Sequence, residues 1–441
     1  MNSRLITRAP RHLRPFSQGS AGASPHHCGK RASRCRLAAG LLAVMHINAA
    51  AAPPPQHEPP ASLAAEGWYA GDLHVHRSPQ EIEKLMQQAD LHIGSVITWW
   101  NETSPWKNLP PPKSPVSFDG GTRFYHVLAG EDERGGGALL YHNMTKPLDI
   151  TGCQREWPSS VKFLRAAKAA GAWCDIEKPF WQDVPLWLAT GLVDSVGICQ
   201  NHMQIGGMMD NEAWGRARDR EKYPGPHGNG YYTQDLYYRI LNCGFRLPPT
   251  AGGASGVLQN PVGYNRVYVQ CEAPLTWEKW WAGLKAGRAF VSNGPLLRVK
   301  AEGQWPGHIF QSAAPLKVTL AGKLDSRDAI KSVELIVNGK ASALSLPHQF
   351  EMKESGWFLV RAIADVPHTF RFASTAPWYV EIGDKMKPPP AREDAQFFLD
   401  WTRQRAAAID KALTDNVKRT EVQAVLKTAE AFWQTLSGPQ N

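Results

Sequence analysis

The chain lacks the short motifs that mark several common catalytic sites. It has no Gly-x-Ser-x-Gly nucleophile elbow, no Gly-x-x-x-x-Gly-Lys-Ser/Thr phosphate-binding loop and no His-Glu-x-x-His pair. Each of these motifs places a nucleophile, a phosphate or a zinc ion at a defined turn or helix, so the corresponding templates are excluded. None of the seven cysteines belongs to a Cys-x-x-Cys pair, so neither a zinc ribbon nor a redox dithiol is indicated.

Acidic residues are absent from the first 52 positions, which contain eight lysine or arginine residues. The whole chain has a formal net charge of +9, so this segment holds nearly all of the excess and the remainder is almost neutral. Because nucleic-acid binding depends on clustered cationic surface, we expect no nucleic-acid partner.

The same segment has the layout of an export signal. Basic residues between Lys30 and Arg36 precede the apolar run Leu37–Met45, and four alanines follow at Ala49–Ala52. This order predicts a signal peptide over residues 1–52, with a buried N-terminal helix as the alternative. The apolar run is too short to cross a bilayer, so we expect an exported protein, periplasmic or secreted, with no membrane span after cleavage.

Composition divides the rest of the chain into four parts. Residues 53–66 are rich in proline and predict an extended linker. From 67 to 295, short apolar runs alternate with amphipathic windows, which indicates β/α units. Residues 296–385 alternate without helices and include the hairpin signal Val337-Asn338-Gly339-Lys340, so a small β-sandwich fits there. Residues 386–441 carry apolar residues at helical intervals and predict a helical hairpin packed on the body.

The expected helices between residues 67 and 295 carry boundary signals. Thr276 precedes the helix predicted over 276–286, and Gly287 follows it. The helices predicted over 160–170 and 233–243 also end at glycines, and we expect the tryptophans of these segments to pack in the core. The expected strands are Ala70–His76, Ile93–Thr98, Tyr125–Ala129, Ala138–Tyr141, Ala172–Ile176, Ser195–Cys199, Arg266–Cys271 and Ala289–Ser292.

Two histidines lie two residues apart in the first of these strands, in Gly71-Asp72-Leu73-His74-Val75-His76. Residues i and i+2 of a strand project to one face, so His74 and His76 can converge on one ion. Asp72 is predicted to accept the outer imidazole N–H, as carboxylates behind metal ligands do. The alternative is two unrelated surface histidines.

Further candidate ligands follow later strands. Glu131 closes the strand near residue 129, His142 closes the next, Asp175 and Glu177 end another, and His202 follows the strand at 195–199. Active sites of β/α barrels gather at the carboxyl ends of their strands, so these side chains are expected to meet. Neutral imidazole and carboxylate are common ligands of divalent transition metals.

Together these motifs resemble the PHP superfamily of metal-dependent hydrolases, and within it the CehA/McbA-like family. The resemblance covers residues 67–295 and includes the segments 263–269 and 293–295. It implies a distorted (β/α)7 barrel in which His74, His76, Glu131, His142 and His202 bind metal.

Three positions depart from the family pattern. Thr98-Trp99-Trp100 replaces a Thr-Asp-His, residues 252–256 lack a Gly-x-Asp-x-His, and Lys178-Pro179 replaces a His-Pro. We therefore expect one or two ions, of Zn or Mn, with Glu177 or Asp175 recruited or in support of the ligands. A single ion with an open position suffices to activate water.

The function predicted from these residues is an exported hydrolase that uses metal-activated water on an ester, carbamate or amide bond. Glu131, Glu177 and His202 are its candidate catalytic residues. The alternatives are a phosphoesterase of the same superfamily and a non-catalytic protein that binds carbohydrate or another ligand through a decayed metal site. Candidate contacts to a small-molecule or carbohydrate substrate are Trp99, Trp100, His227, Arg246 and Arg266, although packing and salt bridges also account for these residue types.

Overall fold

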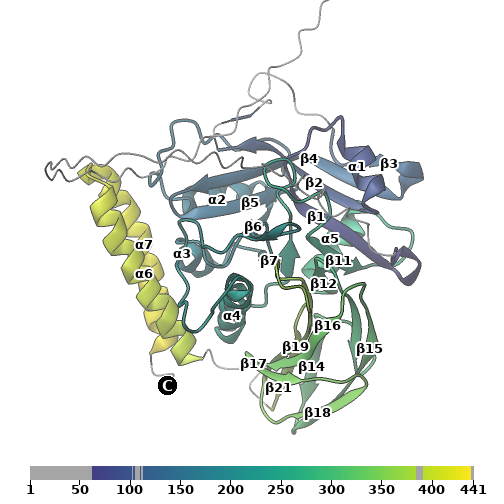
Figure 1. The fold of residues 1–441 in the computed structure, drawn as a ribbon. Helices are drawn as coiled ribbons and strands as arrows, with labels where there is room; N and C mark the ends of the chain where they lie inside the picture. Colours follow the sequence, from purple (N-terminus) through teal and green to yellow (C-terminus); the bar gives the residue numbers. More distant parts are fainter. Residues whose placement is uncertain (1–61, 102, 105–109, 111–112, 384–390, 439–441) are drawn as a thin grey trace, which may run out of the picture. The chain divides into compact units, whose positions relative to one another are not determined.

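The computed structural model describes residues 62–101, 103–104, 110, 113–383 and 391–438. The predicted signal peptide and positions 53–61 of the predicted linker lie outside them. In this described part the fold is mixed α/β, with a large sheet, seven α-helices and a C-terminal helical pair (Figure 1). No helix within it is long and apolar enough to cross a membrane.

Seven strands form the first part of the large sheet, in the order β10-β7-β6-β5-β4-β2-β1. Neighbours run parallel except β5, which is antiparallel to both β4 and β6. β1 also reaches the loop that follows β10, where Val75 forms a parallel bridge with Ser255. These strands are β1 (Trp68–Val75), β2 (Ile93–Trp100), β4 (Arg123–Arg134), β5 (Gly137–His142), β6 (Trp173–Ile176), β7 (Ser195–Cys199) and β10 (Pro249–Ala251).

The strands predicted from the sequence in this part are confirmed, with one notable extension. β4 continues past Ala129 to Arg134 because it forms a hairpin with β5, in which Arg134 lies opposite Gly137. The eight residues between the two predicted strands were too few for a helical crossover, so the antiparallel direction of β5 was available from the spacing. The three residues of β10 were missed because so short a strand gives no periodicity.

Helices in this part are α1 (Ile82–Gln88), α2 (Val161–Ala169), α3 (Val184–Ala189), α4 (Gly228–Asn242) and α5 (Trp277–Lys285). The predicted cap of α5 is confirmed, since the Thr276 side chain accepts from the Lys279 N–H at 3.2 Å. α4 starts earlier than predicted. A Cβ on Gly230 would lie 2.3 Å from the Phe370 ring, so tertiary packing holds a first turn that helix propensity disfavours.

The large sheet continues beyond β1 through β11 (Arg266–Gln270) and β12 (Ala289–Ser292) into β20, β19, β16 and β17. A separate three-stranded sheet has the order β13-β15-β18. The predicted hairpin is confirmed: Val337 pairs with Lys340 across Asn338 and Gly339, whose φ angles are 48° and 85°.

The strands of this second part are β13 (Leu296–Ala301), β14 (Ile309–Ser312), β15 (Leu316–Asp325), β16 (Ile330–Val337), β17 (Lys340–Ala343), β18 (His348–Met352), β19 (Gly356–Ala364), β20 (Phe372–Thr375) and β21 (Trp378–Ile382). The short elements β3 (Val116–Phe118), β8 (Met203–Gln204), β9 (Gly207–Met208), η1 (Ala64–Glu66) and η3 (Asp119–Gly121) complete the described structure.

The C-terminal helical pair consists of α6 (Arg392–Ala412) and α7 (Asn416–Ser437), drawn in yellow in Figure 1. The two helices are joined by the Arg403–Glu430 ion pair at 2.8 Å and by the stacked rings of Phe398 and Trp433. The Trp433 indole N–H also donates to the Pro185 carbonyl of α3 at 3.0 Å. This pair therefore packs against the α/β part, as the sequence predicted.

Candidate metal centre

His74, His76 and Glu131 converge where β1 and β4 approach their ends. The Nε2 atoms of His74 and His76 lie 3.0 Å apart, and Glu131 Oε2 lies 3.6 Å and 3.2 Å from them. One potential ligand atom from each residue falls within 4.8 Å of the other two. The side chains are 3%, 9% and 3% exposed, so three donors meet in a nearly dry site.

The histidines and glutamates of this group stabilise one another's charged forms. Burial lowers the pKa of His74, but Glu131 and Glu177 outweigh it and raise that pKa to about 10. Burial raises the pKa of Glu131, but the two histidines outweigh it and hold that pKa well below its usual range. An ion bound by these residues would take the place of the proton that His74 otherwise shares with the carboxylates.

Glu177 lies behind His74 and is fully engaged by other groups. Its Oε1 lies 3.4 Å from His74 Nδ1, while the Lys178 ammonium donates to both its oxygens and Trp181 Nε1 donates to Oε2 at 2.8 Å. Burial raises the pKa of Glu177, but Lys178 and His74 outweigh it and bring the pKa to about 2. Glu177 therefore orients the outer nitrogen of His74, the role that the sequence had assigned to Asp72.

The predicted role of Asp72 is wrong. Its buried carboxylate accepts backbone N–H groups from His74, Gly253 and Gly263, at 3.1, 3.3 and 2.8 Å, and no imidazole. It thus fixes β1, which carries His74, to two loops. Burial raises the pKa of Asp72 to about 6, although these backbone donors lower it.

Asp175 also has a structural partner set. It accepts from the Ser195 hydroxyl at 2.5 Å and from the Thr250 hydroxyl at 2.7 Å, so it links β6 to β7 and β10. It also lines a small cavity with His74 and Glu177, which places it beside the centre.

His142 does not join the group, because β5 runs antiparallel to β4. His142 ends β5 and therefore lies beside the part of β4 that precedes Glu131. Its Nδ1 pairs with Ser95 Oγ at 2.7 Å. Its ring lies 5.7 Å from that of Trp281 on α5, and burial lowers its pKa to about 3. The expectation that it ends at the same sheet edge as Glu131 is corrected by this strand direction.

His202 lies near the centre but outside the three-residue group. Its Nδ1 is 2.9 Å from the Asn211 carbonyl oxygen, and its ring is 5.5 Å from Phe180. Burial, with the Lys178 ammonium, lowers its pKa to about 3. The Lys178 ammonium that donates to Glu177 thus also disfavours protonation of His202. The sequence predicted His202 as a metal ligand, but among the described residues the potential ligand atoms that converge are those of His74, His76 and Glu131.

The adjacent tryptophans of β2 point in opposite directions, as alternation requires. Trp99 is 1% exposed, stacks on Tyr141 and fills the space beside Gly130, so it belongs to the core and its predicted substrate contact is wrong. Trp100 lies 5.0 Å from the His76 ring, and its indole N–H donates to Glu133 Oε2 at 3.1 Å. Trp100 remains a candidate for substrate contact.

The other three predicted substrate contacts lie in structural roles. His227 Nε2 is 2.9 Å from the Val366 carbonyl oxygen, and Arg246 pairs with Glu381 at 2.6 Å while covering the Tyr379 ring. Arg266 is 2% exposed and donates to the backbone carbonyls of Gly263 and Ala89. Their side chains hold segments of the fold together.

The sequence did not lead us to predict two residues that lie at this site, Glu133 and Lys178. Glu133 shares a face of β4 with Glu131, and burial beside Glu131 raises its pKa to about 8. Lys178 is 3% exposed and reaches Glu177 from the adjacent position. The i, i+2 relation to Glu131 was a signal for Glu133, whereas the inward turn of a lysine had none in the sequence.

Comparisons with known proteins add little to this geometry. No model of a known protein family and no curated protein matches the chain. Among solved structures, the chain is similar to the fibronectin(III)-like modules of Clostridium thermocellum CbhA, with 16% identity over 19% of this chain and 94% of that one. The TM-score is 0.14.

Proposed function

We propose that the protein is an exported metal-dependent hydrolase that acts on an ester, carbamate or amide bond. The observation that carries the proposal is the convergence of two imidazole nitrogens and one carboxylate oxygen from His74, His76 and Glu131. Two histidines and one acidic residue form a ligand set known from catalytic zinc sites.

The residues present suit a divalent transition ion. Glu131 Oε2 is buried without a hydrogen-bond partner, and the two Nε2 atoms face each other at 3.0 Å. Such an arrangement leaves donors that a cation would satisfy. An ion held there with an open coordination position would lower the pKa of water to about 7 and polarise a carbonyl group.

The fold that we propose for residues 67–295 is a distorted seven-stranded barrel. The strand order β10-β7-β6-β5-β4-β2-β1 and the Val75–Ser255 bridge between β1 and the loop after β10 support closure. For residues 296–385 we propose a β-sandwich, supported by side chains of both sheets, such as Leu297 and Phe358, that share one core.

The side chains around the three ligands have separable tasks in this proposal. Glu177 holds His74, and Lys178 neutralises Glu177 so that its charge does not draw the imidazole away from the ligand position. Glu133 lies on the ligand face of β4 and is the carboxyl group left to exchange a proton with substrate or leaving group. Trp100 covers His76 from one side and limits how bulky groups approach.

The decisive experiment is the metal content of the purified mature protein compared with a His74→Ala/His76→Ala double variant. We expect about one zinc or manganese ion per parent chain and a loss of at least tenfold in the affinity of the variant. The matched control is His308→Ala/His348→Ala, which removes two histidines from the second part of the fold.

The control variant should retain the ion. A parent that binds no transition metal, or a double variant that binds it as tightly as the parent, would refute the proposal. Where the ion is present, aryl esters, carbamates and phosphoesters then separate the carboxyl-type hydrolase from the phosphoesterase.

A further inference from the structure

Three consecutive glycines connect β4 to β5, directly after the two glutamates of the centre. A Cβ on Gly135 would lie 2.1 Å from Glu156 Oε1, one on Gly136 would lie 2.0 Å from Asp183 Oδ2, and one on Gly137 would lie 2.2 Å from Trp181 Cγ. The turn is therefore enclosed by three side chains. A Cβ at Gly136 or Gly137 lacks room because it would meet Asp183 or Trp181 atoms close to their backbones, and Gly137 in addition has φ 111°.

Backbone hydrogen bonds also join the turn to the chain segments around Glu156 and Asp183. Gly135 N–H donates to the Arg155 carbonyl at 2.8 Å, and Asp183 N–H donates to the Gly136 carbonyl at 2.8 Å. The indole N–H of Trp181, the side chain against Gly137, also donates to Glu177 behind His74. The position of the turn is thus linked to both the strand that carries Glu131 and the residue that orients His74.

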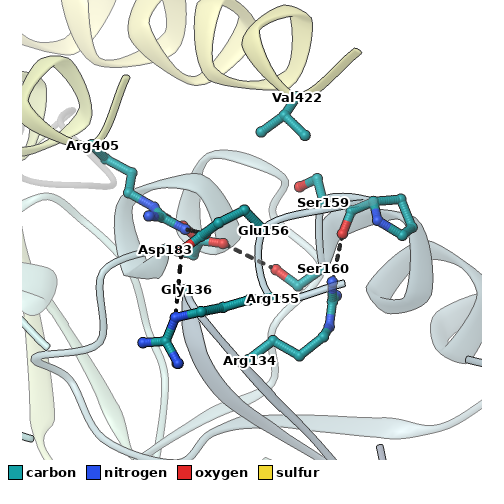
Figure 2. A pocket seen from close by; sticks show the side chains of 11 residues that line it. Arg134, Gly136, Arg155, Glu156, Ser159, Ser160, Asp183, Arg405 and Val422 are labelled. Atoms are coloured by element: carbon teal, nitrogen blue, oxygen red, sulfur yellow. Dashed lines mark hydrogen bonds and ion pairs between the residues drawn. The ribbon is translucent and has the colours of Figure 1, made fainter. Parts of the chain in front are cut away.

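Arg405 of α6 bridges Asp183 and Glu156, the two acidic side chains that lie against the turn. Its Nε donates to Asp183 Oδ1 at 2.7 Å and its second nitrogen Nη2 donates to Glu156 Oε2 at 2.6 Å, with the arginine only 6% exposed (Figure 2). Ser160 completes the cluster with a hydroxyl donated to Asp183 Oδ2 at 3.3 Å. The negative charges of Asp183 and Glu156 would repel each other across the turn without this guanidinium.

We infer that Arg405 is a positioning residue for the metal centre, although it belongs to the C-terminal helical pair. It acts through Asp183 and Glu156 on the Gly135–Gly137 turn, and the turn sets the register of the β4–β5 hairpin that presents Glu131. The inference rests on the proposed function, because it concerns how that centre is held.

The test is Co²⁺ affinity, measured by titration and by the visible spectrum of the bound ion, in the full mature chain. We expect Arg405→Met to weaken Co²⁺ binding by about tenfold or more, as loss of an outer support of metal ligands does. We also expect its spectrum to change, because Glu131 shifts relative to the two histidines. A role in stability alone would lower the melting temperature without altering the affinity or spectrum of folded protein.

Arg403→Ala is the matched control. This neighbour on α6 is 50% exposed and pairs with Glu430 of α7, so its loss disturbs the helical pair and leaves the turn intact. We expect the parent affinity for Co²⁺ in this variant. An equal loss in both variants would overturn the inference, since the effect would then belong to the helices in general.

Arg405→Lys keeps the test valid if Arg405→Met does not fold. It retains the positive charge, but one ammonium does not reproduce two contacts from a planar guanidinium, so we expect weakened binding and an altered spectrum in a folded protein. Parent-like affinity and spectrum in folded Arg405→Lys or Arg405→Met would overturn the inference and leave the proposed function standing. A parent without Co²⁺ binding would overturn both.

Discussion

Gly252, in the loop after β10, lies against β1 so closely that a single methyl group should disturb this strand. A Cβ at this position would lie 2.3 Å from His74 Cβ and 2.8 Å from His74 N. These atoms have no alternative rotamer, so the contact can be relieved only by moving β1 away from the loop. We therefore predict that Gly252→Ala lowers both stability and metal affinity.

The size of the effect follows from the contact. Overpacking costs about 1–3 kcal/mol, and a rigid backbone neighbour favours the upper end of that range. For a chain of this length the entropy of unfolding is about 0.9 kcal/mol per kelvin, so the melting temperature should fall by about 3 °C. Ligand distances in metal sites tolerate shifts of only about 0.2 Å, so we expect at least about tenfold weaker Co²⁺ binding.

The adjacent glycine supplies the control. A Cβ on Gly253 would lie 3.3 Å from Asn260 Cβ, a tight contact that a small side-chain shift relieves. Calorimetry and Co²⁺ titration of Gly253→Ala should stay near the parent values. If Gly252→Ala melts within 1 °C of Gly253→Ala and binds Co²⁺ equally well, the packing argument about β1 is refuted.

Three further predictions concern stability. Burial lowers the pKa of His126 to about 4 from about 6.5 in the unfolded chain, so the unfolded state takes up more protons between these values. His126 should therefore contribute a loss of up to about 3 kcal/mol in the free energy of unfolding between pH 6.5 and pH 4. Denaturant unfolding should show a fall that is smaller by that amount in His126→Leu. Thr276→Ala removes the cap of α5 and should lower the free energy of unfolding by about 1 kcal/mol in the same assay. The loss should be as large at high salt, because the contact is uncharged. An unchanged free energy of unfolding would argue against the cap. Gly339→Ala places a side chain at φ 85° and should destabilise the hairpin by about 1 kcal/mol, whereas Gly339→Asn should destabilise it less. If both variants are as stable as the parent, the turn assignment is contradicted.

The sequence predicts the elements well where local chemistry determines them. Thr276 and Gly287 define the ends of α5, and Asn338-Gly339 defines the hairpin of β16 and β17, because capping and left-handed turns depend on single residues. The convergence of His74 and His76 followed from strand alternation alone. None of these inferences needed information about distant parts of the chain.

Long-range geometry explains what could not be predicted. His142 was placed at the wrong edge although the eight residues between the two predicted strands already favoured the hairpin that makes β5 antiparallel to β4. Glu177 takes the role that was expected of Asp72, whereas Asp72 binds backbone N–H groups. Their partners come from residues 74 and 263 and from a lysine whose inward orientation depends on packing. Arg246 and Arg266 looked like anion contacts because a sequence does not show which carboxylates or carbonyls will reach them.

The position of β1 between its two neighbours sets the order in which the centre can form. β1 pairs with β2, which follows soon after it in the chain, but its other partner, β11, ends at Gln270. Closing a loop of that length is slow compared with local pairing. A nascent chain therefore presents His74 and His76 as a bare pair long before β1 is completed on both sides. In the proposed function, an ion would therefore be bound late, after β11 has paired with β1.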